Sequence, residues 1–98
     1  MVKKITWTLR AIKNYDSIYD YLLLEWSYKI ADDFKNKLNR QLSVLKQYPL
    51  AGLKSNKRPG FMKFVLNEYN TLYYRIKKQE LIVMHIRDNR QNPDKFKF

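Results

Sequence analysis

Residues 61–93 read FMKFVLNEYNTLYYRIKKQELIVMHIRDNRQNP and contain three short runs rich in strand-forming apolar residues that alternate with polar ones. Polar dipeptides separate these runs, and two-residue breaks are typical of β-hairpin turns. The three runs are 61–66, 69–77 and 80–87, and the two turns are 67–68 and 78–79. This pattern predicts an antiparallel sheet against which the rest of the chain must pack.

Alternation along the last run predicts which side chains face the core, because successive side chains of a strand point to opposite sides of its sheet. One set is entirely apolar and is expected to face the core: Ile82, Met84 and Ile86. The other set comprises Leu81, Val83, His85 and Arg87. We therefore expect His85, the only histidine, and Arg87 to lie on the open face of the sheet.

The run at 69–77 is expected to place a second arginine on that open face. Its apolar set comprises Leu72, Tyr74 and Ile76. Arg75 belongs to the opposite set. Arg75, His85 and Arg87 then share one surface, provided that the strands pair in the matching register. This surface is the candidate site if the protein acts on a phosphate or binds a polyanion.

Two amphipathic helices are predicted upstream of these strands. Apolar residues recur at spacings of three and four over residues 9–25, and again from Ser27 to Tyr48. Thr8 and Ser27 are the expected N-caps, and Pro49 ends the second helix because it disfavours helical backbone in the preceding residue. With a short strand at 2–7, the order is β-α-α-β-β-β. This order predicts an α+β fold in which a two-helix hairpin packs on one face of a largely antiparallel sheet.

The length and the charge of the chain limit its class. Its 98 residues correspond to one domain, 1–98. Twenty Lys and Arg against nine Asp and Glu give a net charge of +11, which favours polyanionic partners such as nucleic acid or an acidic protein segment. Without cysteine and with a single histidine, no metal or cofactor is expected. No apolar run approaches the ~18 residues of a membrane span, so a cytoplasmic protein is expected.

Residues 49–60, PLAGLKSNKRPG, form the one long loop and carry the basic residues Lys54, Lys57 and Arg58. Two alternatives stand for this basic cluster. The residues belong to a solvated connection, or they add to the site on the sheet if the loop folds over it.

Residues along nearly the whole chain resemble the RelE/ParE superfamily of toxins from bacterial type II toxin–antitoxin systems. In the first half the matching positions are Trp7, Thr8, Ala11, Ile18, Tyr21, Ala31, Phe34, Leu38, Leu45, Pro49 and Gly52. In the second half they are residues 72–76, LYYRI, and residues 82–93, IVMHIRDNRQNP. The resemblance covers roughly residues 5–95, and its element order agrees with the order predicted above.

The resemblance implies a small basic toxin that is held by an acidic antitoxin. RelE-like members cut mRNA in the ribosomal A site without a metal, which implies a ribosome-dependent mRNA endonuclease. ParE-like members poison DNA gyrase and are not nucleases, which implies a non-enzymatic inhibitor instead. A third alternative is a non-toxic module that binds RNA or pairs with an antitoxin.

Metal-free RNA cleavage would need a proton carrier and cations that stabilise the phosphate. His85 is the candidate proton carrier, because imidazole titrates near neutral pH. Arg75 and Arg87 are assigned with it to catalysis, since guanidinium binds phosphate oxygens bidentately. The candidate RNA or phosphate-binding residues are Lys54, Lys57, Arg58, Lys63 and Arg90.

The end of the last strand weakens the nuclease assignment and raises the ParE-like alternative, while mRNA cleavage stays the first expectation. RelE-like nucleases tend to carry His-Tyr or a Tyr near this end, whereas here it reads Asp88-Asn89-Arg90. His85 then has a structural interpretation as a packed or hydrogen-bonded side chain. Arg75 and Arg87 pair with antitoxin carboxylates in that interpretation, and residues 90–93 lock the C-terminal end against the helices.

Overall fold

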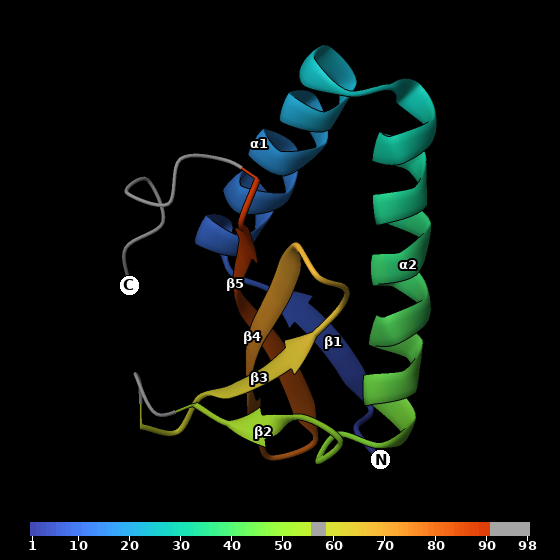
Figure 1. The fold of residues 1–98 in the computed structure, drawn as a ribbon. Coiled ribbons are helices and arrows are strands. Elements are labelled where there is room, and N and C mark those ends of the chain that lie inside the picture. Colours follow the sequence, from blue (N-terminus) through green and yellow to red (C-terminus); the bar gives the residue numbers. More distant parts are fainter. Residues whose placement is uncertain (56–58, 91–98) are drawn as a thin grey trace.

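The computed structural model describes residues 1–55 and 59–90, which form two helices on one face of a five-stranded sheet (Figure 1). The elements are β1 Lys4–Trp7, α1 Leu9–Glu25, α2 Tyr28–Gln47, β2 Leu53–Lys54, β3 Met62–Val65, β4 Asn70–Lys77 and β5 Glu80–Asp88. The strand order is β1-β5-β4-β3-β2, with β1 parallel to β5 and every other pair antiparallel. The predicted α+β architecture is confirmed. The prediction missed β2, because two residues are too few to show a period.

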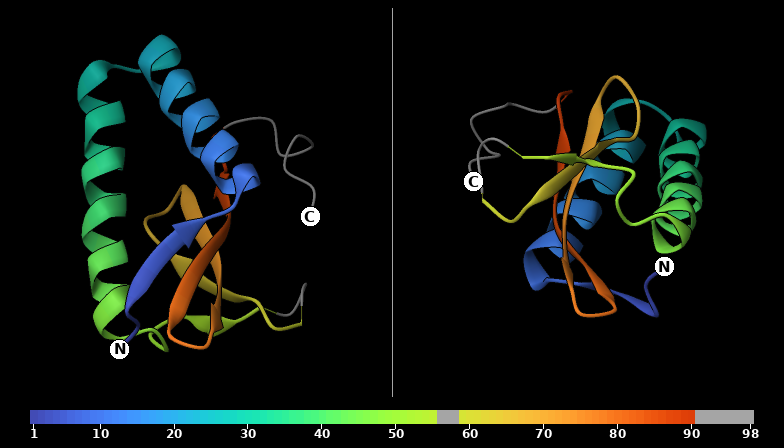
Figure 2. Two further views of the ribbon diagram at one scale, coloured as in Figure 1. Left: turned by 180° about the vertical axis from the view of Figure 1, so that it is seen from behind. Right: turned by 90° about the horizontal axis from the view of Figure 1, so that it is seen from below.

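Both helices begin where the sequence predicts. The hydroxyls of Thr8 and Ser27 accept hydrogen bonds from the backbone N–H groups of Ala11 and Ile30, each at 3.1 Å, and so satisfy donors that a helix start leaves unpaired. The apolar faces of α1 and α2 then pack on the sheet (Figure 2). Their buried residues are Ala11, Ile18 and Leu22 on α1, and Ala31, Phe34, Leu38, Leu42 and Leu45 on α2. Neither helix is long and apolar enough to cross a membrane.

A β-bulge at Met84 changes the core face of β5. His85 pairs with Tyr73, but the next pair along is Val83 with Tyr74, so Met84 has no partner on β4. The extra residue reverses the alternation of side chains between the two halves of the strand. The prediction that Ile82 and Met84 face the core is therefore wrong. Both are half-buried, and the fully buried apolar residues of β5 are Leu81, Val83 and Ile86.

Tyr74 anchors the segment after α2 to the sheet. Its side chain is fully buried, and its hydroxyl donates to the carbonyl of Pro49 at 2.7 Å and accepts from the N–H of Gly52 at 3.1 Å. Burial raises the pKa of the Tyr74 hydroxyl above its ordinary value, and the hydrogen bond from Gly52 partly offsets that rise.

Replacing Tyr74 with phenylalanine is expected to flatten the alkaline part of the stability profile. Because the folded-state pKa is raised, the stabilisation is fully present below about pH 10, the unfolded value, and is lost as pH rises through the folded pKa. The measurement is the free energy of unfolding in urea from pH 8 to pH 11. The pKa of Tyr15 is also raised by burial, but it is common to both chains and cancels. Parallel profiles for the wild type and Tyr74→Phe would contradict the expectation.

Candidate functional site

The outer face of the sheet, which is turned away from the helices, gathers the predicted basic residues of β3, β4 and β5. Tyr73 pairs with Lys63 on one side and with His85 on the other. The neighbouring pairs of β4 with β5 are Thr71 with Arg87 and Arg75 with Ile82. Because paired residues share a face, the expected grouping of Arg75, His85 and Arg87 on one face is present, and Lys63 joins it.

His85 differs from the other members of this group because it is buried. Its side chain is only 1% exposed, and its ring centroid lies 5.7 Å from that of Tyr73, which is itself 5% exposed. The expectation that His85 lies on an open surface is therefore wrong. A general acid or base must come within about 2.6–3.2 Å of the atom that exchanges its proton, so an external substrate does not reach the imidazole in this conformation.

The two arginines of the outer face are more accessible. Arg75 is exposed, and its guanidinium carbon lies 5.8 Å from the ring centroid of Phe61, within the range of a cation–π contact. Arg87 is half-buried at the end of the sheet near Asn70. Both therefore present charge to a partner.

Other predicted phosphate-binding residues do not join this group. Lys54 is paired with Met62, whose side chain packs on the core, so Lys54 projects to the opposite side of the sheet from Lys63. Lys57 and Arg58 lie outside the described residues. The idea that the loop folds over the site therefore stays a prediction for these two residues.

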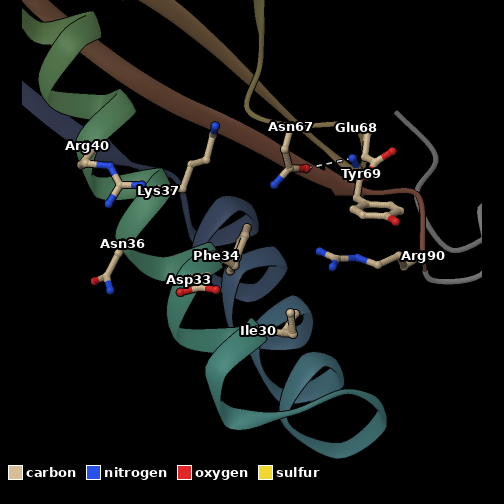
Figure 3. Close-up of a pocket in the computed structure, with 10 residues that line it drawn as sticks. All are labelled: Ile30, Asp33, Phe34, Asn36, Lys37, Arg40, Asn67, Glu68, Tyr69 and Arg90. Carbon is tan, nitrogen blue, oxygen red and sulfur yellow. Dashed lines mark hydrogen bonds between the residues drawn. The ribbon is translucent and has the colours of Figure 1, made fainter.

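Arg90 is held in a buried ion pair rather than presented as a free phosphate ligand. Its Nε lies 3.2 Å from Oδ1 of Asp88, with 9% and 0% of the two side chains exposed. Its Nη2 donates to Asn70 at 3.2 Å, and its guanidinium carbon lies 4.3 Å from the ring centroid of Tyr69 (Figure 3). The expectation that Arg90 binds phosphate is therefore corrected. Its guanidinium is already engaged by these partners, which give the residue a structural role.

The end of β5 is also tied to the first helix. The hydroxyl of Tyr21 donates to the carbonyl of Arg90 at 3.0 Å. The predicted lock of the C-terminal end against the helices is thus present at Arg90, and residues 91–93 lie outside the described part of the chain. The tertiary partners Tyr21 and Asn70 were missed, because no sequence spacing links residues so far apart.

A groove of about 350 Å³ lies between α2 and the β3–β4 turn (Figure 3). The α2 wall carries Asp33, Lys37 and Arg40, and the opposite wall carries Glu68 and Arg90. The mixed signs give the groove no strong preference for an anion. Within residues 1–55 and 59–90, no three His, Cys, Asp or Glu side chains gather in a group that could hold a metal ion.

Comparison with known proteins places this geometry in a family. A family model described as the ParE toxin of the type II toxin–antitoxin system parDE matches residues 5–93. A solved structure of the chromosomal ParDE TA system from P. aeruginosa is similar, with 23% identity and a TM-score of 0.76 over 89% of this chain and 96% of that one. No curated protein matches the sequence significantly.

Two further solved structures share the fold at lower identity. The YoeB/ParE toxin from Agrobacterium tumefaciens has 20% identity and a TM-score of 0.61, over 88% of this chain and 98% of that one. The E. coli DinJ-YafQ toxin-antitoxin complex has 12% identity and a TM-score of 0.61, over 92% of this chain and 96% of that one. Identities this low show a common fold and nothing finer.

Proposed function

The chain belongs to the ParE toxin family of type II toxin–antitoxin systems, as its resemblance to the RelE/ParE superfamily predicted, and we propose that it is a non-enzymatic toxin that inhibits DNA gyrase. The single observation that carries this choice is the burial of His85, which is 1% exposed. It is the only histidine of the chain and the best candidate for proton transfer at neutral pH.

The end of β5 supports the same proposal. Asp88 and Arg90 neutralise each other in a buried pair, at the position where RelE-like nucleases tend to carry His-Tyr or Tyr. A carboxylate and a guanidinium engaged in this way supply neither a proton carrier nor an open phosphate ligand. The outer face is left with exposed or half-buried cations and without an accessible acid–base pair among the residues described.

In this proposal the arginines of the outer face bind a protein surface. Arg75 and Arg87 present guanidinium groups whose planar forks match carboxylates, and arginine is enriched at protein interfaces. The same face is available to the antitoxin. We propose that an acidic antitoxin segment neutralises the net charge of +11 and competes with the target for these two residues.

Unopposed expression of the chain is expected to stop DNA synthesis before protein synthesis. Pulse labelling of both processes after induction measures the order, and purified gyrase with the purified protein tests supercoiling directly.

Arg75→Ala with Arg87→Ala is expected to weaken inhibition of gyrase at least tenfold, because about 1.4 kcal/mol of lost interaction already gives that factor. Lys29→Ala with Lys35→Ala is the matched control, because it removes the same number of positive charges from the exposed face of α2.

A second candidate, mRNA cleavage, is favoured by the grouping of Lys63, Arg75, His85 and Arg87 on one face. It predicts that protein synthesis falls first and that translated mRNA is cut. His85→Gln separates the two candidates, because a proton carrier is essential to cleavage and not to gyrase binding. Loss of all toxicity in a folded His85→Gln variant, together with cut mRNA in the wild type, would refute the gyrase proposal.

A further inference from the structure

Four lysines from two distant parts of the chain meet at one end of the sheet. Lys3 precedes β1 and Lys4 begins it, whereas Lys77 ends β4 and Lys78 lies in the β4–β5 turn. The ribbon views place the N-terminus close to this hairpin (Figures 1 and 2). Together with Gln79 and Glu80, the four lysines line a surface hollow of about 470 Å³, here called the lysine hollow.

Backbone pairing holds the two walls of the lysine hollow together. The N–H of Lys3 donates to the carbonyl of Gln79 at 2.6 Å, and Lys4 is paired with Glu80 at the start of the parallel ladder. The preceding residue, Val2, is 3% exposed and donates its N–H to the carbonyl of Lys46 at 3.0 Å. The backbone that carries the lysines is therefore placed before any ligand arrives, which lowers the entropic cost of binding.

The charge of the lysine hollow is not balanced by its own residues. Glu80 is the one carboxylate among its described lining residues, and it is already engaged by the hydroxyl of Thr6 at 2.7 Å and by Lys4 at 3.9 Å. Four lysines against one glutamate leave an excess of three positive charges. All four lysines are exposed, so their ammonium groups are open to an anion from solution.

We propose that the lysine hollow binds the phosphodiester backbone of a nucleic acid. Lysine ammonium groups are compact cations with three donors each, and they bind phosphate as point charges. Among the described lining residues none is aromatic or aliphatic, so apolar contact is limited to the methylene stems of the lysines, and lysine is depleted at protein interfaces. A phosphate chain needs only the charges.

Binding at the lysine hollow is independent of base sequence. Ammonium groups bind phosphate oxygens whatever the bases are, and the described lining residues offer no aromatic ring on which a base could stack. Contacts of this kind position a protein on a nucleic acid and carry no sequence information. The site goes beyond the proposed function and does not rest on it, because it concerns different residues from Arg75 and Arg87.

The salt dependence of affinity tests the lysine hollow. The full-length protein is titrated into a labelled 20-base-pair DNA duplex and into a labelled 20-nucleotide RNA, from 50 to 300 mM KCl, with fluorescence anisotropy as the readout. A plot of the logarithm of the binding constant against the logarithm of salt concentration is linear. Each phosphate contact contributes about 0.9 to the magnitude of its slope on duplex DNA and about 0.7 on single strands. Lys3→Gln with Lys77→Gln and Lys78→Gln is therefore expected to lower the slope by about 2.7 on the duplex or about 2 on the RNA. Lys4 is left in place to keep its pair with Glu80.

A matched triple variant separates a site from general charge. Lys13→Gln with Lys29→Gln and Lys35→Gln removes three exposed helix lysines and gives the same net charge, +11 less 3, or +8. The proposal expects its slopes to equal those of the wild type. If the Lys3, Lys77 and Lys78 variant has a smaller salt slope on the duplex alone or on the RNA alone, the site is supported. The result then identifies which of the two nucleic acids binds there.

Three results would overturn the lysine hollow as a phosphate site. One is an equal fall of slope in both triple variants, and another is no fall in either. The third is tight binding of a labelled 20-residue polyglutamate that depends on the same three lysines, which would assign the hollow to an acidic peptide. Thermal unfolding of each variant checks that the fold is intact. Gyrase inhibition is measured separately. Loss of the nucleic-acid site therefore leaves the proposed gyrase inhibition untouched, and failure to inhibit gyrase leaves the nucleic-acid site untouched.

Discussion

Replacing Asp88 with alanine is expected to lower the free energy of unfolding by about 3 kcal/mol. Asp88 is fully buried, and its Oδ1 accepts from both the Nε and the backbone N–H of Arg90, at 3.2 and 2.9 Å. Without the carboxylate, the guanidinium keeps Asn70 and the ring of Tyr69 as partners but loses its counter-charge. These remaining contacts place the cost at the lower end of the ~3–5 kcal/mol for breaking a buried ion pair.

Urea unfolding with a constant m-value measures this loss. Asp20→Ala is the control, because Asp20 is exposed on α1 and its removal is expected to change stability by less than about 0.5 kcal/mol. Removing both partners, as in Asp88→Ala with Arg90→Leu, is expected to cost less than Asp88→Ala alone, since no buried charge is left unpaired. If Asp88→Ala costs no more than Asp20→Ala, the ion pair does not stabilise the end of β5.

Replacing Gly52 with alanine is expected to destabilise the protein by about 3 kcal/mol through overpacking and a disturbed buried hydroxyl. A Cβ at this position would lie 2.5 Å from the hydroxyl oxygen of Tyr74 and 2.7 Å from the carbonyl oxygen of Lys63. Relief of that clash moves the hydroxyl that bridges Pro49 and Gly52. The segment between α2 and β3 then loses its anchor on the sheet.

Gly60→Ala makes the same chemical change in open space and is the control. Apart from its chain neighbours, no heavy atom of the described residues lies within 4 Å of a Cβ there, but φ is +82°, so about 1 kcal/mol of backbone strain is expected. A double-mutant cycle with Tyr74→Phe tests the mechanism, because removing the hydroxyl removes the nearest clash. Gly52→Ala is then expected to cost less in the Tyr74→Phe background, and strictly additive costs would contradict the proposed contact.

Local features of the fold could be predicted from the sequence because they depend on neighbouring residues. The caps Thr8 and Ser27 accept hydrogen bonds from backbone N–H groups three residues further along the chain. Spacings of three and four place apolar residues on one helix face. The hairpin turns and the apolar set of β4 follow from similarly short-range patterns. The grouping of Arg75 with Arg87 did not follow from such a pattern, because Arg75 pairs with Ile82 and only the bulge at Met84 brings Arg87 to the same face.

Features that depend on pairing between distant residues could not be predicted in this way. The bulge at Met84 is a property of how β5 pairs with β4, and it exchanged Ile82 for Leu81 and Val83 on the core face. The burial of His85 and the partners of Arg90 likewise depend on contacts between separate elements.

The charge of the chain illustrates the same division. The excess of positive charge is a property of composition, and it predicted a polyanionic or acidic partner. Where that charge gathers depends on the parallel pairing of β1 with β5, which brings Lys3 and Lys4 beside Lys77 and Lys78. Spacing along the chain specifies helices, caps and turns, whereas the register between strands specifies which charges meet, because hydrogen bonds between strands join residues far apart in sequence.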